Sequence, residues 1–181
     1  MNGCLKNEKF FQELLYKQFS QRMFGVCLRY APNRDVADDI FQEGFIRVFA
    51  SLHQFKGNAA LSSWMYRVFV TTAINYIQRR LKPQMEVSLN EDFNPAEEDI
   101  SEQEKDHWLN HISTDEALEM VQQLPEKYRL AINLYAVDKH SHEDIAKLLN
   151  ISVATSRSQV SRARKLLSTM LKQELERKIG R

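Results

Sequence analysis

The sequence predicts an all-α protein made of two small helical domains that are joined by an acidic, flexible linker. Only five Gly and four Pro occur in 181 residues, so few positions interrupt a helix. Apolar residues recur at helical spacing, and no stretch shows the alternation of a strand. Acidic residues gather between two basic parts of the chain. We therefore expect a first domain over 1–84, a linker over 85–112 and a second domain over 113–181.

Three helices are expected in the first domain. The first ends near Tyr30, where Ala31-Pro32-Asn33 breaks the periodicity. The second runs from about Asp35 to Leu52, and a polar loop from Gln54 to Ala60 leads into a third helix from about Ser62 to Arg80. The apolar stripe of the first helix consists of Phe10, Leu14, Leu15, Phe19, Met23, Val26 and Cys27, and that of the second of Phe41, Phe45, Val48, Phe49 and Leu52.

The linker is marked by its charge. Residues 86–106 carry nine Asp or Glu against one Lys or Arg, whereas residues 1–85 carry six against 12 and residues 107–181 nine against 12. High charge with few apolar residues is typical of a segment without a packed core. The net charge of +1 therefore hides two basic regions, which favour a nucleic-acid partner.

The second domain carries a helix-turn-helix pattern from Glu143 to Lys165, EDIAKLLNISVATSRSQVSRARK. Helical signals resume near Thr114, pause at Leu124-Pro125 and continue to Val137. In the pattern itself, a first helix with an apolar stripe and the turn Asn150-Ile151-Ser152 precede a helix with a polar, cationic face, which is typical of DNA reading. A surface helix of a soluble bundle is the alternative. The stripes are Ile145, Leu148 and Leu149 in the first helix and Val160, Ala163 and Leu167 in the second.

Aromatic and cationic residues cluster on the third helix of the first domain. Its sequence permits one broad face with Trp64, Arg67, Thr71, Asn75, Gln78 and Arg79. Aromatic rings beside cations suit unpaired nucleic acid, because a splayed base stacks on a ring while a cation holds its phosphate. The alternative is that Trp64 anchors a core and that Arg79 and Arg80 only end a helix in solvent.

Several other classes of function are excluded. Cys4 and Cys27 lack metal or redox spacing and are expected to be free thiols. His107 and His111 stand at i, i+4 without a third ligand, so we expect no metal and no cofactor. No membrane span, signal peptide, phosphate loop or catalytic dyad is recognisable, which predicts a cytoplasmic protein that is not an enzyme and does not insert into a membrane.

From about Glu8 to Leu171 the chain resembles a bacterial sigma factor of the extracytoplasmic-function (ECF) group of the sigma-70 family. The resemblance rests on DVADDIFQEGFIRVFASLHQFKG, SSWMYRVFVTTAINYIQRR and LPEKYRLAINLYAVDKHSHEDIAKLLNISVATSRSQVSRARKLL, in this order. It implies a region 2-like first domain and a region 4-like second domain. It also implies a promoter-specificity subunit that binds core RNA polymerase, duplex -35 DNA and single-stranded -10 DNA, with an anti-sigma factor as the expected regulator.

The resemblance assigns roles to residues of this sequence. It implies that core polymerase binds Asp38, Asp39, Gln42, Glu43 and Arg47. The -10 strand is expected at Lys56, Asn58, Ala60, Leu61, Ser63, Trp64 and Arg67, and the aromatic-cationic face adds Asn75 and Arg79. Bases of the -35 element are expected at Arg157, Ser158, Gln159, Ser161 and Arg162, and phosphates at Thr155, Arg164 and Lys165. Thr71 and Ala154 depart from the frequent Asn and Gly of the family.

Two rival functions remain open at this point. A conventional helix-turn-helix regulator would use only the second domain, and a polymerase-interaction module would read no DNA. The acidic linker also has two interpretations, namely a segment that threads toward the polymerase active centre and a plain solubilising tether.

Overall fold

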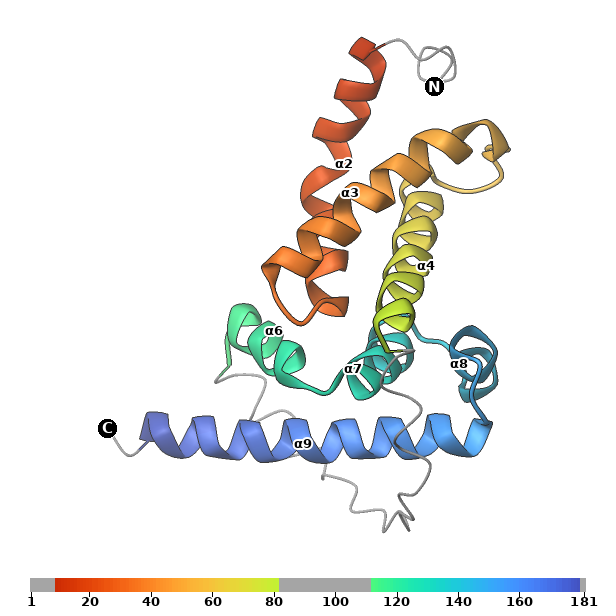
Figure 1. Ribbon diagram of the computed structural model, residues 1–181. Helices are drawn as coiled ribbons and strands as arrows, with labels where there is room; N and C mark the ends of the chain where they lie inside the picture. Colours follow the sequence, from red (N-terminus) through yellow and green to blue (C-terminus); the bar gives the residue numbers. More distant parts are fainter. Residues whose placement is uncertain (1–8, 82–111, 180–181) are drawn as a thin grey trace. The chain divides into compact units, whose positions relative to one another are not determined.

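The computed structural model describes residues 9–81 and 112–179, and every regular element in these two ranges is helical (Figure 1). The chain divides between Arg80 and Leu81 into two compact units. The all-helical prediction is therefore confirmed over the described residues. The predicted linker, except for Ile112, lies outside the described residues, as do Cys4, His107 and His111.

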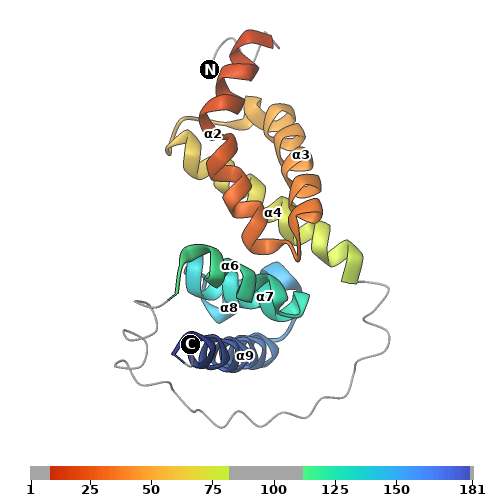
Figure 2. The same ribbon diagram turned by 90° about the vertical axis from the view of Figure 1, so that its left-hand side faces the viewer.

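The first unit contains α2 (Lys9–Tyr30), α3 (Arg34–Ser51), the short 3-10 helix η1 (Leu52–Gln54) and α4 (Leu61–Leu81). The first helix, α2, ends at Tyr30 as predicted. Asn33 then caps the start of α3, since its Oδ1 accepts the backbone N–H of Val36 at 3.0 Å. Figures 1 and 2 show α2 and α3 side by side, joined by this short turn. The predicted bounds of all three helices are confirmed to within one residue.

Aromatic side chains form much of the contact between these helices. The rings of Phe41 and Phe45 on α3 contact Tyr16 of α2 and Phe69 of α4, with centroids 4.8–6.0 Å apart. Gly44 lies directly against Phe69, since a Cβ at this position would come within 2.4 Å of the ring. A glycine is therefore required at this contact between α3 and the Phe69 ring of α4.

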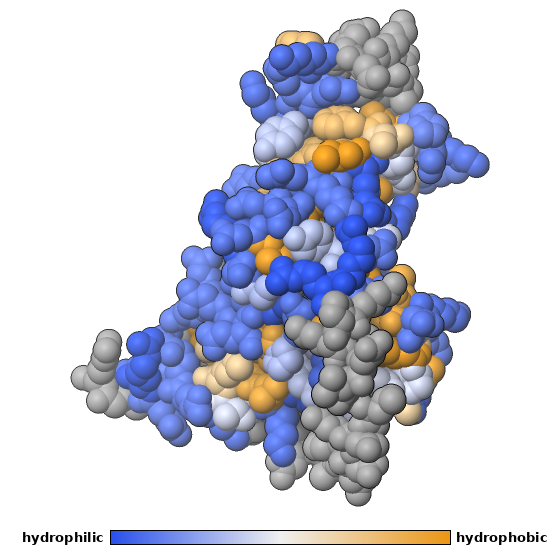
Figure 3. Space-filling model, viewed as in Figure 1, coloured by the Kyte–Doolittle hydropathy of each residue, from blue (hydrophilic) through white to orange (hydrophobic). Residues whose placement is uncertain are grey.

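The predicted stripe of the first helix is wrong at its start. Phe10 is 67% exposed and Leu14 54% exposed, whereas Leu15, Met23, Val26 and Cys27 are buried. The two exposed residues precede Tyr16, where α2 packs on the aromatic rings of α3. Figure 3 shows apolar side chains gathered over the first part of α2 and the end of α3.

The second unit contains α6 (Thr114–Gln123), α7 (Glu126–Ile132), the π-helix η3 (Asn133–Val137), α8 (His142–Leu149) and α9 (Val153–Ile179). Ser113 caps α6 in a capping box with Glu116, and the pause predicted at Leu124-Pro125 separates α6 from α7. Figures 1 and 2 show α7 lying across α9, and their buried residues form one core. Its members are Leu124, Tyr128, Ala131, Ile132, Val160 and Ala163, with Leu167 packed against them.

The turn between α8 and α9 follows the predicted chemistry. Asn150 adopts the left-handed conformation at φ 54°, and the Ser152 hydroxyl accepts the backbone N–H of Thr155 at 2.9 Å. One predicted core position is wrong: Leu148 is 39% exposed, because α8 buries Ile145, Ala146 and Leu149 instead. In the described ranges no helix is both long and apolar enough to cross a membrane.

Candidate nucleic-acid interfaces

The first half of α9 presents a polar, cationic surface. Arg157 and Lys165 are exposed, and Ser158 and Ser161 are half-buried on the same side of the helix. The opposite side, with Val160 and Ala163, lies in the core of the unit. Hydroxyl and guanidinium donors on one face of a helix that follows a tight turn match the requirements for reading base edges in a major groove.

Two residues of the predicted -35 set are oriented toward the interior of the unit. The Arg162 guanidinium donates to the Tyr128 hydroxyl on α7 at 3.1 Å. The Oε1 atom of Gln159 is buried and has no hydrogen-bond partner among the described residues. Thr155 is exposed, but its hydroxyl lies 2.8 Å from that of Ser152 in the helix cap. Arg162 and Gln159 would therefore have to rearrange before contacting DNA, whereas Thr155 is already exposed.

Ring stacking and a polar contact connect the start of α8 with η3 and α9. Tyr135 of the π-helix stacks on His142, with centroids 4.7 Å apart, and the Arg164 guanidinium lies 5.2 Å from the centroid of the Tyr135 ring. The His142 Nδ1 lies 3.0 Å from the Ser156 hydroxyl. Desolvation, followed by the charges of Arg157 and Arg164, lowers the pKa of His142, so its ring is neutral at physiological pH. The sequence interpretation missed Tyr135, because a π-helix has no periodicity signal of its own.

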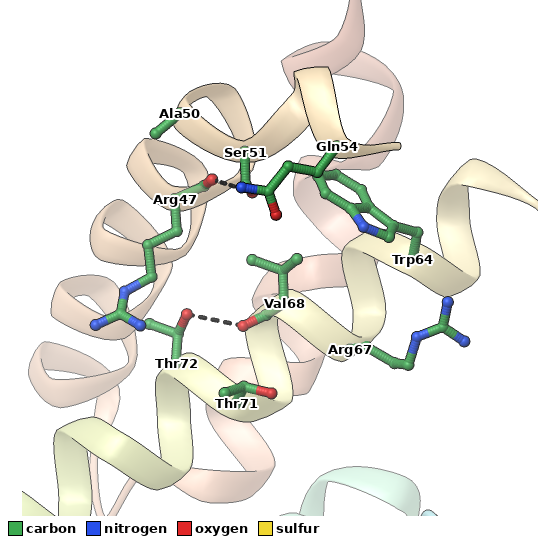
Figure 4. Close-up of a pocket in the computed structure, with 9 residues that line it drawn as sticks. All are labelled: Arg47, Ala50, Ser51, Gln54, Trp64, Arg67, Val68, Thr71 and Thr72. Carbon is green, nitrogen blue, oxygen red and sulfur yellow. Dashed lines mark hydrogen bonds between the residues drawn. The ribbon is translucent and has the colours of Figure 1, made fainter. Parts of the chain in front are cut away.

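An open cleft of about 490 Å³ lies in the first unit between α3 and α4 (Figure 4). Figure 4 shows Arg47 on the α3 side, Trp64 and Arg67 on the α4 side and Val68 between them. Trp64 also packs against Phe55, with ring centroids 5.6 Å apart. The lining residues are Arg47, Ala50, Ser51, Gln54, Trp64, Arg67, Val68, Thr71 and Thr72. An aromatic ring beside cations and hydroxyls suits a single-stranded nucleotide.

The structure brings only part of the predicted -10 set to this cleft. Trp64 and Arg67 line it, whereas the other seven residues do not. Lys56, Asn58, Ala60 and Ser63 are exposed on the loop and the first turn of α4, and Leu61 is half-buried. Asn75 and Arg79 lie farther along α4. The sequence interpretation missed Gln54 and Ser51, because the cleft depends on how α3 packs against α4.

The predicted polymerase-binding residues on α3 separate into two groups. Gln42 is exposed and Asp38 is half-buried. The other three join contacts toward α4. Asp39 accepts the Tyr76 hydroxyl at 2.7 Å, and Glu43 forms ion pairs with Arg47 at 2.6 Å and Arg79 at 2.8 Å. The hydrogen bond to Asp39 raises the pKa of Tyr76, whereas Arg79 and Arg47 lower the pKa of Glu43 against an opposing desolvation.

The acidic residues and Cys27 were the remaining candidates for metal or thiol chemistry within the described ranges. Over residues 9–81 and 112–179, no three His, Cys, Asp or Glu side chains gather as metal ligands. Cys27 is buried as a free thiol, and burial raises its pKa to about 12, which keeps it protonated.

Comparison with known proteins identifies both units. The Sigma-70 region 2 family matches residues 15–82 and the Sigma-70 region 4 family matches residues 114–167. The ECF RNA polymerase sigma-E factor of Escherichia coli (strain K12) is 33% identical over 174 residues, which cover 91% of this chain and 88% of that protein. The RNA polymerase sigma-H factor of Pseudomonas aeruginosa is 30% identical over 172 residues, covering 88% and 85%.

A solved structure supports the fold. It is the sigma factor RpoE in complex with the anti-sigma factor NepR from Bartonella quintana, with a TM-score of 0.52 and 21% identity over 91% of this chain and 98% of that chain. The order of the two matched regions also agrees with the order of the two helical units. On the strength of the sequence matches, the chain belongs to the ECF group of RNA polymerase sigma factors, whose members confer promoter specificity and are not enzymes.

Proposed function

We propose that this protein binds core RNA polymerase, directs it to promoters with a -35 and a -10 element, and promotes opening of the DNA. The observation that carries the proposal is the presence of two different nucleic-acid surfaces in one chain. One is the polar helix face with the exposed Arg157 and the half-buried Ser158 and Ser161, which suits duplex DNA. The other is the cleft with Trp64 and Arg67, which suits an unpaired strand.

In the second unit, we propose that α9 reads the -35 element in the major groove. Arg157, Ser158 and Ser161 are presented for base contacts without rearrangement, and Arg164 and Lys165 are exposed for phosphates. Arg162 would contact a base after releasing Tyr128 and Gln159 after turning outward, whereas Thr155 is already exposed for a phosphate. These three residues complete the proposed -35 surface when the helix binds DNA.

In the first unit, we propose that a base of the -10 element leaves the stack and enters the cleft beside Trp64. The exposed loop residues Lys56 and Asn58 would meet the backbone on the way in, together with Ala60, Leu61 and Ser63. Asn75 and Arg79 would guide the strand beyond the cleft. Extrusion of a base costs a few kcal/mol, and stacking on an aromatic ring returns about 1–3 kcal/mol of it.

The outer face of α3 is the proposed docking surface for core polymerase. Asp38, Asp39 and Gln42 give it an acidic and polar character that suits a basic partner.

Because the sigma factor in the solved complex binds an anti-sigma factor, we also propose that such a protein regulates this chain. We also propose a cytoplasmic location, because transcription is initiated there. The boundaries 1–84, 85–112 and 113–181 are proposed as the polymerase and -10 domain, the linker and the -35 domain.

In vitro transcription is the direct test. Purified core RNA polymerase, this protein and a fragmented bacterial genome are combined, and the RNA starts are sequenced. We expect discrete starts that share two upstream motifs and that require the protein. Binding to duplex DNA without any starts would instead identify a conventional regulator, and binding to polymerase without starts or DNA binding would identify an interaction module.

A further inference from the structure

Arg47 faces the cleft, although its sequence position suggests the outer face of α3. Its neighbour Ile46 is 69% exposed, and Gln42, one turn earlier, is exposed too. Arg47 instead lines the cleft between α3 and α4, and its guanidinium lies beside Thr72, at the end of the cleft away from Trp64 (Figure 4). One step of about 100° around a helix is enough to separate these two directions.

Glu43 fixes the direction of Arg47. One carboxylate oxygen of Glu43 accepts both the Nε and the Nη2 of Arg47, at 3.0 and 2.6 Å. The same carboxylate accepts the Nη2 of Arg79 from α4, at 3.0 and 2.8 Å. Because the arginines lower the pKa of Glu43, the carboxylate is ionised at neutral pH. One negative charge therefore joins two helices and holds the Arg47 guanidinium in place at one end of the cleft.

Arg47, Glu43 and Arg79 together carry a net positive charge, which favours binding of an anion. Arg47 and Arg79 contribute two positive charges and Glu43 one negative charge, so the three side chains carry a net +1. The Arg47 side chain remains 41% exposed. A guanidinium that is held in place loses less conformational entropy on binding a phosphate than a mobile one does.

We propose that Arg47 binds a phosphate of the DNA strand captured in the cleft, and that Glu43 is the positioning residue that holds Arg47 for this contact. The inference rests on the proposed function of the cleft and deepens it. It also reassigns both residues, since resemblance to the family places them in the polymerase contact. Trp64 then stacks on the base from α4 while Arg47 binds its phosphate from α3.

The test separates polymerase binding from DNA opening. The variants are Arg47→Ala, Arg47→Lys and Glu43→Gln, with Gln42→Ala as the control on the exposed face of α3. Core affinity is measured with labelled full-length protein. Opening is measured on holoenzyme, with every variant saturated by core, as permanganate reactivity of -10 thymines and as the salt dependence of binding to a -10 single strand. Circular dichroism establishes that each variant is folded.

We expect Arg47→Ala to leave core affinity within about twofold and to reduce opening by about tenfold or more, as for the loss of a charge-assisted hydrogen bond. A plot of log K against log salt has a negative slope. The magnitude of this slope should decrease by about 0.7, the value for one phosphate on a single strand. Arg47→Lys should keep the slope, and Glu43→Gln should reduce opening less than Arg47→Ala. Gln42→Ala should show the reverse pattern, with weaker core binding and normal opening.

Loss of core affinity in Arg47→Ala with normal opening at saturation would overturn the proposal, and so would an unchanged salt slope. Loss of core affinity in Glu43→Gln would overturn the positioning role of Glu43. Failure of the wild-type holoenzyme to open any promoter would contradict the proposed function itself. Normal opening by wild type and by Arg47→Ala alike would contradict only this inference.

Discussion

The helix face of the second unit and the cleft of the first unit gather their residues in different ways. Arg157, Ser158, Ser161 and Lys165 come from one helix, so a spacing of three and four residues is sufficient to place them together. Arg47 and Trp64 come from two helices and meet only because α3 packs against α4. The helix face therefore depends on local structure, and the cleft depends on tertiary packing.

This difference predicts that the two surfaces can be lost separately. Damage to the core of one unit should abolish one surface and leave the other intact, since each unit has its own buried residues. Two core substitutions, one in each unit, test whether the helix face and the cleft are lost independently. Surface substitutions then test the contribution of single residues.

The largest effect is expected from Arg129→Met in the second unit. Arg129 is buried, and its Nη1 donates to the carbonyl oxygens of Gln122 and Leu124 at 2.7 and 2.8 Å. Met fills a similar volume but leaves both carbonyls without this donor, which costs about 2–6 kcal/mol. Hydrogen–deuterium exchange should show faster exchange in α6 and α7 and unchanged exchange in α4. The control Arg177→Met removes an exposed pair with Glu174 and should change stability by less than about 1 kcal/mol. Equal loosening of α4 would show that the units are not independent.

A smaller loss is expected from Gly44→Ala in the first unit. The added methyl group would come within 2.4–2.9 Å of the Phe69 ring, so α3 and α4 must separate. Overpacking of this kind costs about 1–3 kcal/mol. The matched control is Gly25→Ala on α2, where nothing lies within 4 Å of the new methyl group and helix propensity adds up to about 1 kcal/mol of stability. We expect Gly44→Ala to impair DNA opening while -35 binding persists. Normal opening at normal stability would show that the cleft tolerates separation of the helices.

The same contrast explains how much of the protein could be predicted from its sequence. The helices, their bounds and the turn at Asn150 followed from periodicity and capping, which are local. The exposure of Phe10 and Leu148 did not, because a helix can be apolar where no neighbour covers it. The cleft wall formed by Arg47 and Gln54 also needed the packing of α3 on α4. The Glu43 ion pairs link the predicted polymerase-binding residues Glu43 and Arg47 to Arg79 of the predicted -10 set, and no pattern in the sequence indicated this link.

Substitutions on α9 should distinguish residues that only bind DNA from residues that also stabilise the unit. Arg157 is exposed, so Arg157→Ala should weaken binding to the correct -35 duplex by about 1–3 kcal/mol and leave the stability of the unit unchanged. Arg162→Ala also removes a contact to Tyr128, so it should lower stability as well as affinity. Gel-shift titration and thermal unfolding of each variant separate the two effects. Tyr128→Phe is the control, because it removes the hydrogen bond and retains Arg162. Equal stability of both arginine variants would show that the Tyr128 contact contributes nothing.

The smallest expected effect concerns acid stability at the end of the second unit that is remote from the DNA-reading face. Glu116 on α6 accepts the backbone N–H of Ser113 at 2.8 Å and pairs with Lys178 of α9 at 2.8 Å. Lys178 first, and then Ser113, lower the pKa of Glu116 from 4.5 to about 2. Because the folded pKa is the lower one, this carboxylate stabilises the unit above about pH 4.5, and the contribution disappears as the pH falls toward about 2.

Glu116→Gln should therefore flatten the acid limb of stability between these pH values, with faster hydrogen exchange in α6 at pH 7. Glu174→Gln is the matched control. Its pKa is also lowered, by Arg177, but that pair lies within α9 and joins no second helix. A change in α6 exchange for Glu116→Gln alone would establish that the contact across the two helices matters. Equal changes in both variants would instead attribute the effect to net charge, because each substitution removes one negative charge from the same unit.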